Sequence, residues 1–395
     1  MEITKEQLLA EKHPLTACDL FITERCNLKC TYCFHKQNPV TLKVEDGKKI
    51  LDNLYIANPE FFNITFFGGE PLLYPELVLE LAEYAVTLWG LENLKFTVST
   101  NGMYFDELMF KKYKDLNFRF QVSLDGDEET STLTRKGIDF NRVCNNLQSI
   151  LALFPKTHVR MTYTPENVGR LISNVMFVHR LGVKTIMFHA TMESDWTKES
   201  IAQYIFQLKE IYSYRRYINR LDGSLEIAHV DKPLNIINGT ALADEDFCKA
   251  GKEYVAILPN GDVYPCHRAA SNRLFKLGNI LNVEMPIIRG VFLKINKHST
   301  GCSAKCPASK TCHSCIIQHY MKNDNLEKPK EDYCQICIAE NGMAYEFLPF
   351  ELAERQDKKL NTMARVLLDL ADQNAEFKDM IVDILKTPEE KKENK

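Results

Sequence analysis

Apolar runs and amphipathic stretches alternate strictly through the first half of the chain, and this pattern constrains the fold more than any other feature. The runs, rich in β-branched and aromatic residues, predict strands at 17–23, 62–67, 95–100, 118–124, 158–163 and 185–189. The amphipathic stretches predict helices at 43–55, 74–89, 105–114, 140–154, 168–181 and 200–218. Such alternation is typical of parallel strands with right-handed crossovers. Six units fall short of a closed eight-unit barrel, so we predict an α/β fold built as a partial (β/α)6 barrel.

Three cysteines, Cys26, Cys30 and Cys33, stand in CNLKCTYC directly after the first predicted strand. Three thiolates can hold three irons of a [4Fe-4S] cluster, and no further cysteine lies near enough in the sequence to complete the set. The fourth iron would then be open to a small molecule. The alternative is a closed zinc site in which His35 supplies the fourth ligand.

Further motifs follow the next predicted strands, and parallel barrels place their chemistry at these carboxyl ends. The second strand is followed by Gly68, Gly69, Glu70 and Pro71. Paired glycines allow close backbone contact, and their carbonyls can accept hydrogen bonds from an ammonium group, although an ordinary tight turn explains them equally well. The third and fourth strands end in polar segments that contain Ser99, Asn101, Ser123 and Asp125. These side chains suit a ribose or an amino acid, but turn chemistry also selects Asn-Gly and Asp-Gly.

The CxxxCxxC triplet, with aromatic Tyr32 and Phe34 around its last cysteine, resembles the radical SAM superfamily, as do the GGEP, STNG and SLDG segments. The resemblance implies a radical SAM barrel in which S-adenosylmethionine binds the open iron and is cleaved to a 5′-deoxyadenosyl radical. It also implies that GGEP binds the methionine amino group and that the four polar residues after the third and fourth strands contact the cofactor. Arg160, on the fifth strand, is predicted to bind the methionine carboxylate. Arg135 competes for this role, and Arg160 is alternatively a solvated barrel charge.

The composition changes beyond residue 230, where Gly, Pro and Asn return and cysteines become dense. Residues 253–258 and 263–266 predict a β-hairpin whose Asn260-Gly261 turn supplies positive φ angles. Eight cysteines follow residue 240, which is the number that two four-thiolate clusters require: Cys248, Cys266, Cys302, Cys306, Cys312, Cys315, Cys334 and Cys337. A zinc ribbon over 302–315 is an alternative. Cys18 and Cys144 are predicted to be core residues.

This layout resembles the SPASM extension of radical SAM enzymes. The resemblance implies an outer auxiliary cluster on Cys302, Cys306, Cys312 and Cys334 and an inner one on Cys248, Cys266 and Cys315. Cys337 is the fourth ligand of the inner cluster, or one iron of the inner cluster is open. In the central cysteine run, the family usually has the two-residue gap first and the three-residue gap last, whereas this sequence has them in the reverse order. Individual ligands can therefore shift from one cluster to the other. The expected cofactors are S-adenosylmethionine and three iron–sulfur clusters, one SAM-binding [4Fe-4S] and two auxiliary [4Fe-4S].

The expected domains are an N-terminal extension (1–14), the barrel (15–230), a small Cys-rich SPASM domain with the β-hairpin (231–347), and C-terminal helices with a disordered tail (348–395). A net charge of −4 without a basic stripe argues against a nucleic-acid partner, so we expect none. The sequence has no long apolar run and no signal peptide, so we expect a cytoplasmic protein without a membrane partner. In a reducing cytosol, 13 cysteines indicate metal binding.

The expected function is hydrogen abstraction from a peptide or protein, with electrons from a donor such as flavodoxin or ferredoxin. SPASM relatives act mostly on peptides, which favours a thioether or carbon–carbon crosslink in a ribosomally made peptide. Formylglycine formation, as in the similar anaerobic sulfatase maturases, is the alternative, although His267 stands where that group typically has an Asp that acts as the base. We expect His267 to be a loop residue, and a role as base is the alternative. A non-enzymatic zinc or iron–sulfur binding module is the alternative of another class. About fifteen residues precede the first strand, so leader recognition is expected at the barrel mouth, in the second domain, in a separate protein, or not at all. No catalytic residue is assigned.

Overall fold

A computed structural model describes residues 14–221, 223–241, 248–282, 306, 308, 311–312, 315–324 and 330–371, with side chains through residue 354. The chain divides into two compact units, Met1–Met343 and Ala344–Lys395. The predicted N-terminal extension, apart from residue 14, and the predicted tail lie outside the described residues.

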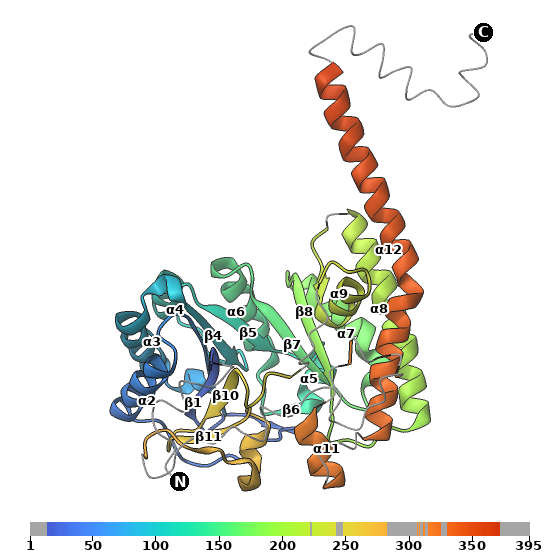
Figure 1. Cartoon of the computed structure of the whole chain (residues 1–395). Coiled ribbons are helices and arrows are strands. Elements are labelled where there is room, and N and C mark those ends of the chain that lie inside the picture. The colour runs from blue at the N-terminus through green and yellow to red at the C-terminus, as the bar shows by residue number, and fades with distance from the viewer. Residues whose placement is uncertain are drawn as a thin grey trace, which may run out of the picture. The chain divides into compact units, whose positions relative to one another are not determined.

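All six predicted strands are present as a parallel series, which confirms the α/β fold class. They are β1 (Ala17–Thr23), β3 (Phe62–Gly68), β4 (Leu94–Thr100), β5 (Arg119–Ser123), β7 (His158–Tyr163) and β8 (Thr185–Ala190). They belong to one sheet of order β12-β11-β10-β1-β3-β4-β5-β7-β8-β9. Figure 1 shows the strands side by side with their crossover helices outside. The carboxyl ends of the parallel strands therefore share one edge, as the sequence predicts.

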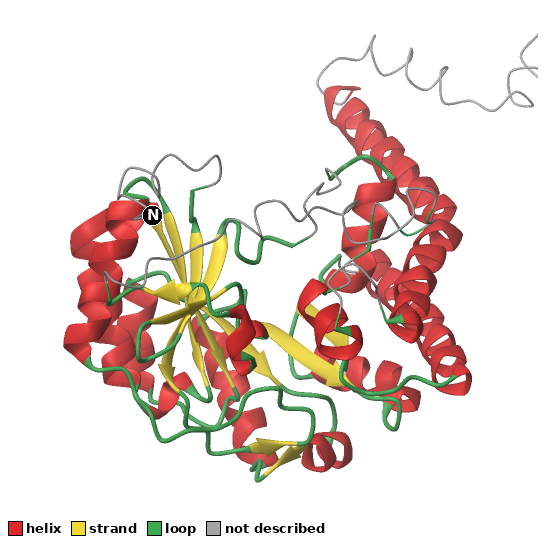
Figure 2. Cartoon of the chain, turned by 60° about the horizontal axis from the view of Figure 1, so that its bottom comes forward, coloured by secondary structure: helices red, strands yellow, loops and turns green. Residues whose placement is uncertain are grey.

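The predicted helices form within a few residues of the expected ends: α2 (Val44–Ala57), α3 (Pro75–Trp89), α4 (Glu107–Asp115), α6 (Phe140–Leu153), α7 (Leu171–Arg180) and α8 (Lys198–Leu221). A short helix, α5 (Glu128–Thr134), follows β5. Aspartate side chains cap three of these helices at their first turn, since Asp106, Asp127 and Asp139 accept backbone N–H bonds at α4, α5 and α6. Figure 2 shows helices lining the outside of the strands.

An aromatic core joins the sheet to these helices. Phe118 stacks on both Phe66 and Phe96, and Phe110 of α4 stacks on Phe120 with ring centroids 4.8 Å apart. All but Phe118 are almost completely buried, and Phe118 is 4% exposed. Because this core lies between sheet and helices, the strands form a rigid frame for the loops at their ends.

The hairpin of the second region extends the barrel sheet, which the sequence does not predict. Strand β10 (Tyr254–Ile257) pairs in parallel with β1, and β11 (Asp262–Tyr264) and β12 (Gly278–Asn279) follow as antiparallel strands. The hairpin itself is confirmed, but its turn differs. Only Gly261 has a positive φ, of 83°, and its N–H donates to the Leu258 carbonyl at 2.9 Å. The turn thus needs one left-handed residue, where an Asn-Gly type I′ turn needs two.

Two short elements follow α8 at the other edge of the sheet: β9 (Glu226–Ile227), which pairs in parallel with β8, and α9 (Ala228–Ile237). Helix α11 (Ile316–Asn323) precedes α12 (Glu331–Ala371), which begins 17 residues before the predicted helix start. Cys334 and Cys337 are therefore in a helix, three residues apart on one face.

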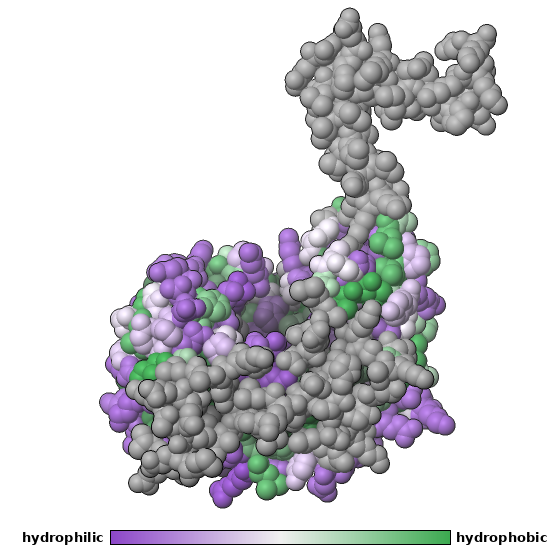
Figure 3. Space-filling view, in the orientation of Figure 1, coloured by the Kyte–Doolittle hydropathy of each residue, from purple (hydrophilic) through white to green (hydrophobic). Residues whose placement is uncertain are grey.

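Polar residues cover much of the described surface in the view of Figure 3. Within the part of the chain that the structure describes, no helix has the length and apolar character needed to cross a membrane.

Candidate functional site

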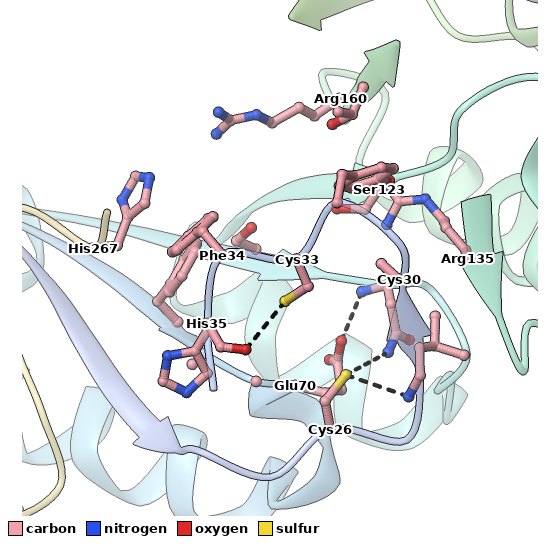
Figure 4. A pocket seen from close by; sticks show the side chains of 18 of the residues that line it. Cys26, Cys30, Cys33, Phe34, His35, Glu70, Ser123, Arg135, Arg160 and His267 are labelled. Carbon is pink, nitrogen blue, oxygen red and sulfur yellow. Dashed lines mark hydrogen bonds between the residues drawn. The ribbon is translucent and has the colours of Figure 1, made fainter. Parts of the chain in front are cut away.

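One pocket collects most of the predicted site residues at the carboxyl ends of the strands. Figure 4 shows its three thiols on one side and Arg160 and His267 across from Cys26. The predicted residues that line it are Cys26, Cys30, Cys33, Gly68, Gly69, Glu70, Ser99, Asn101, Ser123 and Arg160. Pro71 and Asp125 are buried next to it and do not line it.

The cysteine loop is fixed by a two-stranded antiparallel ribbon. Strand β2 (Lys29–Cys30) pairs with β6 (Arg135–Lys136), and Cys30 is the register partner of Arg135. Thr31 N–H extends the ribbon by donating to the Thr134 carbonyl at 2.8 Å. Cys33 N–H donates to the Cys30 carbonyl at 3.1 Å, a turn that leaves Cys33 exposed. Three thiols from eight residues thus reach the same pocket.

The thiol environment fits an iron–sulfur cluster. The pKa of Cys26 is raised to about 11, mainly by burial and in smaller part by the nearby Glu70, Cys30 and Cys33, while the Leu28 N–H acts in the opposite direction. A bound metal would displace these protons. Among the described residues, no three His, Cys, Asp or Glu side chains converge on one metal ion. A cubane cluster has no such need, since each thiolate holds a separate iron. His35, the fourth ligand of the zinc alternative, lies 3.8 Å from Glu24 Oε1.

Gly68 and Gly69 allow the second motif to touch the cysteine loop. A Cβ on Gly68 would lie 2.1 Å from the Thr23 carbonyl oxygen, and one on Gly69 would lie 2.2 Å from that of Arg25. Gly69 N–H donates to Thr23 O and Glu70 N–H to Arg25 O, both at 2.8 Å. The glycines are thus required for backbone packing in addition to any ligand contact.

The Glu70 carboxylate joins two pocket loops. It accepts hydrogen bonds from Thr100 Oγ1 at 2.7 Å, from Asn101 N–H at 2.7 Å and from Leu72 N–H at 3.1 Å. Burial raises the pKa of Glu70 to about 7, although these hydrogen bonds act in the opposite direction. Glu70 is only 2% exposed. Its carboxylate therefore holds the GGEP and STNG segments together from within the protein.

Asn101 faces the cysteine loop. Its Nδ2 donates to Asn27 Oδ1 at 2.7 Å and lies 3.9 Å from Cys26 Sγ, within hydrogen-bond reach of sulfur. Ser99 Oγ accepts a hydrogen bond from Gln121 Nε2 at 3.0 Å. Both side chains therefore have partners that hold them at the pocket wall.

Asp125 is the centre of a buried network. Its carboxylate accepts from Tyr32 Oη at 2.5 Å, Thr134 Oγ1 at 2.7 Å, Arg135 Nη2 at 2.9 Å and Thr162 N–H at 2.9 Å. Four donors leave it little capacity for a ligand. The structure thus places Asp125 behind Tyr32 and Arg135, which do line the pocket.

The two candidate arginines differ in their partners. The Arg135 side chain is paired with Asp125, whereas the Arg160 guanidinium forms no hydrogen bond or ion pair with the residues that the structure describes, although the Arg160 carbonyl accepts from Leu124 N–H at 3.2 Å. Burial and the nearby Arg268 lower the pKa of Arg160 to about 10, so it keeps its charge at neutral pH. The Asp19 carboxylate acts in the opposite direction on this pKa, but it forms no ion pair with Arg160, so the guanidinium is available to a ligand in the pocket.

His267 is a pocket residue that the sequence leaves without a firm role. Its Nδ1 lies 2.6 Å from Asp19 Oδ2 and 3.0 Å from the Tyr254 hydroxyl, which also donates to Asp19. Its ring stacks on Phe67 at 4.9 Å. The available signal was Asp19 itself, a carboxylate inside the apolar strand ACDLFIT that is only 4% exposed.

A second polar junction closes the pocket near β8. Glu193 Oε1 accepts from Arg268 Nη1 and from Gln318 Nε2, both at 2.8 Å. Arg268 and Glu193 line the pocket, and Gln318 lies on α11. The loop after β8 is thereby tied to the cysteine-rich region.

The cysteine-rich region brings three distant thiols together. Burial raises the pKa of Cys266 well above its usual range, and the neighbouring Cys315 and Cys248 raise it further. These are the three cysteines that the sequence assigns to an inner cluster. Cys334 and Cys337 share one face of α12, and Cys306 and Cys312 are half-buried, whereas Cys302 lies outside the described residues.

Known families match both parts of the chain. The radical SAM superfamily model matches residues 20–177, and the SPASM model, an iron–sulfur cluster-binding domain, matches residues 248–316. The first match contains the cysteine triplet and every strand-end motif described above. The second contains Cys248, Cys266 and Cys315.

Relatives and a solved structure agree with these matches. Mycofactocin maturase MftC of Mycobacterium ulcerans is 27% identical, over 66% of this chain and 70% of its own length. The cysteine-type anaerobic sulfatase-maturating enzyme of Clostridium novyi is 26% identical, over 62% of this chain and 71% of its own. The structure of native anSMEcpe with bound AdoMet and Cp18Cys peptide superposes with a TM-score of 0.69, at 21% identity, over 87% of this chain and 100% of that one, which shows a shared fold. The chain therefore carries a radical SAM domain followed by a SPASM domain and belongs to the radical SAM superfamily of enzymes, which use S-adenosylmethionine and iron–sulfur clusters.

Proposed function

We propose that this enzyme modifies a peptide by hydrogen abstraction and installs a thioether or carbon–carbon crosslink. The proposal rests on one observation: three thiols, the GGEP segment and an arginine without an ion-pair partner line a single pocket. The peptide-modifying relatives and the cysteine-rich second domain support it. An auxiliary cluster suits crosslinking, because the product must lose an electron after the new bond forms.

The proposed cofactor contacts follow the pocket walls. Cys26, Cys30 and Cys33 would hold the cluster, the GGEP segment would receive the methionine amino group, and Ser99, Asn101 and Ser123 would contact the rest of the cofactor. When bound, this cofactor supplies the carbon radical that removes a hydrogen atom from the substrate. Asp125 is proposed to act as a positioning residue through Tyr32 and Arg135. The inner auxiliary set is proposed as Cys248, Cys266 and Cys315.

Anaerobic reconstitution tests the proposal. We expect iron incorporation, dithionite-dependent formation of 5′-deoxyadenosine, and a modified peptide when a small cysteine-containing peptide encoded near the enzyme's gene is added. A peptide with a thioether or carbon–carbon crosslink has lost two hydrogen atoms and kept its sulfur, and mass spectrometry measures both. A zinc-filled protein that leaves S-adenosylmethionine intact would instead favour a non-enzymatic metal-binding module.

Replacing Arg160 with alanine is expected to weaken S-adenosylmethionine binding about tenfold or more. A charge-assisted hydrogen bond to a carboxylate contributes about 1.5–3 kcal/mol, and Arg160 is the pocket arginine without a carboxylate partner among the described residues. Equilibrium binding to the reconstituted protein measures the change. Arg119→Ala, at the exposed start of β5, is the matched control and should bind normally. If both variants bind S-adenosylmethionine with equal affinity, a residue other than Arg160 binds the methionine carboxylate.

Formylglycine formation is a second candidate, and His267 is the residue that would act as its base. The short contact to Asp19 fixes a proton on Nδ1, so Nε2 is left as an acceptor on the pocket side. Oxidation of a Cys or Ser side chain to an aldehyde must release a proton, and Nε2 would receive it. Formation of a thioether also releases a proton, so a base at His267 would serve either reaction. The chemical structure of the modified peptide distinguishes the two.

Replacing His267 with glutamine is expected to uncouple the two halves of the reaction. Formation of 5′-deoxyadenosine should continue, because the cysteine triplet and GGEP segment are unchanged, while modified peptide should fall about 100-fold, the scale of general-base catalysis. The ratio of the two products, measured by mass spectrometry, is the readout. A variant that loses both products equally would show that His267 supports the pocket rather than the proton transfer.

A further inference from the structure

A second pocket lies beside the main one, between the cysteine loop and the β10–β11 hairpin, and we call it the hairpin pocket. Its lining includes polar residues from both elements and from the turn after the hairpin: Glu24, His35, Lys36, Asn260, Asp262 and Arg273. Of the described residues, His35 alone belongs to the lining of both pockets. A molecule that extends from one pocket into the other would therefore pass this side chain.

The His35 imidazole offers the hairpin pocket an unused hydrogen-bonding atom. Its side chain is 7% exposed, and its Nε2 has no hydrogen-bond partner among the described residues. Nε2 lies 3.8 Å from Glu24 Oε1, which is beyond hydrogen-bond distance. Glu24 lines the hairpin pocket and not the main one, so Nε2 faces the hairpin pocket, and Figure 4 shows the ring directed away from Cys30 and Arg160. Buried polar atoms are seldom left without a partner, and a ligand in this pocket would supply one.

Two cations of the hairpin pocket lack a counter-ion. Lys36 and Arg273 are exposed, and neither side chain forms an ion pair with a residue that the structure describes. Asp262 is already paired with Lys276 at 2.6 Å, so these two charges cancel. Glu24 is only 8% exposed, so its carboxylate lies deeper than the two cations. One buried carboxylate thus faces two exposed cations, and the positive charge that remains attracts an anion.

The positions of these groups define a complementary ligand. At the exposed side, an anion can pair with the Lys36 ammonium and bind the Arg273 guanidinium bidentately. Deeper in, Asn38 donates to Glu24 Oε1 at 3.3 Å, whereas no described residue donates to Glu24 Oε2. Oε2 can therefore accept an N–H from the same ligand. A peptide residue with a carboxylate, at the C-terminus or on an aspartate or glutamate side chain, combines such an anion with a backbone N–H a few bonds away.

We infer that the hairpin pocket binds a carboxylate-bearing residue of the peptide substrate, close in sequence to the residue that is modified in the main pocket. The inference rests on the proposed function, because it requires a peptide substrate. The peptide would cross from one pocket to the other at His35, the side chain that both linings share. Lys36 and Arg273 are then specificity-determining residues, since they select peptides by a charge beside the modified residue and take no part in the chemistry.

Binding of three synthetic peptides to the reconstituted protein with S-adenosylmethionine tests the inference. Each peptide is N-acetylated and has one cysteine between alanines: the first ends in a free carboxylate, the second is amidated, and the third is amidated with an aspartate beside the cysteine. Calorimetric titration should show that the first or the third binds at least about tenfold more tightly than the second. Whichever binds more tightly identifies the source of the carboxylate, and added salt should narrow the difference.

Substitution of the two cations tests whether this pocket is responsible for the preference. Lys36→Ala/Arg273→Ala should abolish the preference for a carboxylate, and Lys36→Glu/Arg273→Glu should reverse it, which a merely structural role of two exposed side chains would not do. Lys112→Ala/Lys114→Ala is the matched control, since both lysines are exposed on α4, which contributes a residue to neither pocket. The control should keep the preference of the wild type.

The inference is overturned if the wild type binds all three peptides equally or binds none of them. A preference for the carboxylate that survives both substitutions of Lys36 and Arg273 overturns it as well. The proposed function fails separately, if the wild type leaves S-adenosylmethionine intact in the presence of dithionite. The titrations would then still decide whether the hairpin pocket takes a carboxylate.

Discussion

Replacing Cys30 with alanine is expected to remove the first cluster and reduce cleavage of S-adenosylmethionine to background. Each thiolate of the triplet holds a separate iron, and alanine offers no ligand. Cys30 is also locked in position by the β2–β6 ribbon, so no neighbouring cysteine can move into its place without breaking that pairing. The iron content should fall by the amount that one cluster holds, and the iron bound by the second domain should remain.

Iron analysis and the yield of 5′-deoxyadenosine after anaerobic reconstitution check this result. Cys144→Ala is the matched control, since Cys144 lies on α6 outside the pocket and is only half-buried. It should keep full iron and full cleavage. Cleavage that persists in Cys30→Ala would show that the reactive iron is held elsewhere, and the proposed function would have to be abandoned.

Replacing Glu70 with alanine is expected to destabilise the protein by about 3 kcal/mol and to abolish measurable S-adenosylmethionine binding. The change leaves Thr100 Oγ1, Asn101 N–H and Leu72 N–H without their acceptor in a buried site. An unsatisfied buried donor costs about 1–3 kcal/mol, and partial relaxation reduces the sum of three. The GGEP and STNG segments would also lose the carboxylate that joins them, so both walls of the cofactor site would shift.

Thermal unfolding of the reconstituted protein and equilibrium binding measure the two effects. Glu83→Ala on α3 is the matched control, because Glu83 is exposed and does not line the pocket. It should change the free energy of unfolding by less than about 0.5 kcal/mol. Normal binding by a stably folded Glu70→Ala protein would show that the two segments hold their positions without the carboxylate.

The hairpin shows where prediction from sequence stopped. Its two strands were readable from alternation and from the Asn-Gly pair, but its pairing with β1 was not, because a parallel partner more than 200 residues away leaves no local signal. That pairing brings His267 beside Asp19, with Nδ1 2.6 Å from the carboxylate. A histidine that resembled a loop residue is thus part of the pocket.

The motif residues show a similar division. GGEP was predicted as a ligand-contact segment, whereas the structure adds a second reason for its glycines, the approach of the Thr23 and Arg25 carbonyls. Asp125 was predicted to contact the cofactor, and the structure surrounds it with four protein donors. Residue type identified the chemistry, but only the neighbours determine whether a polar group has capacity left for a ligand.

The sequence by itself determined the alternation of strands and helices, the cysteine triplet and the strand-end motifs, since hydrophobic period and ligand spacing are local properties of the chain. The tertiary structure alone decided which charged side chains are paired: Arg135 forms an ion pair with Asp125, whereas Arg160 and the Lys29–Lys136 pair form none with a described residue. The reason is physical. Electrostatic energy depends on distance and burial in space, which residue order does not specify.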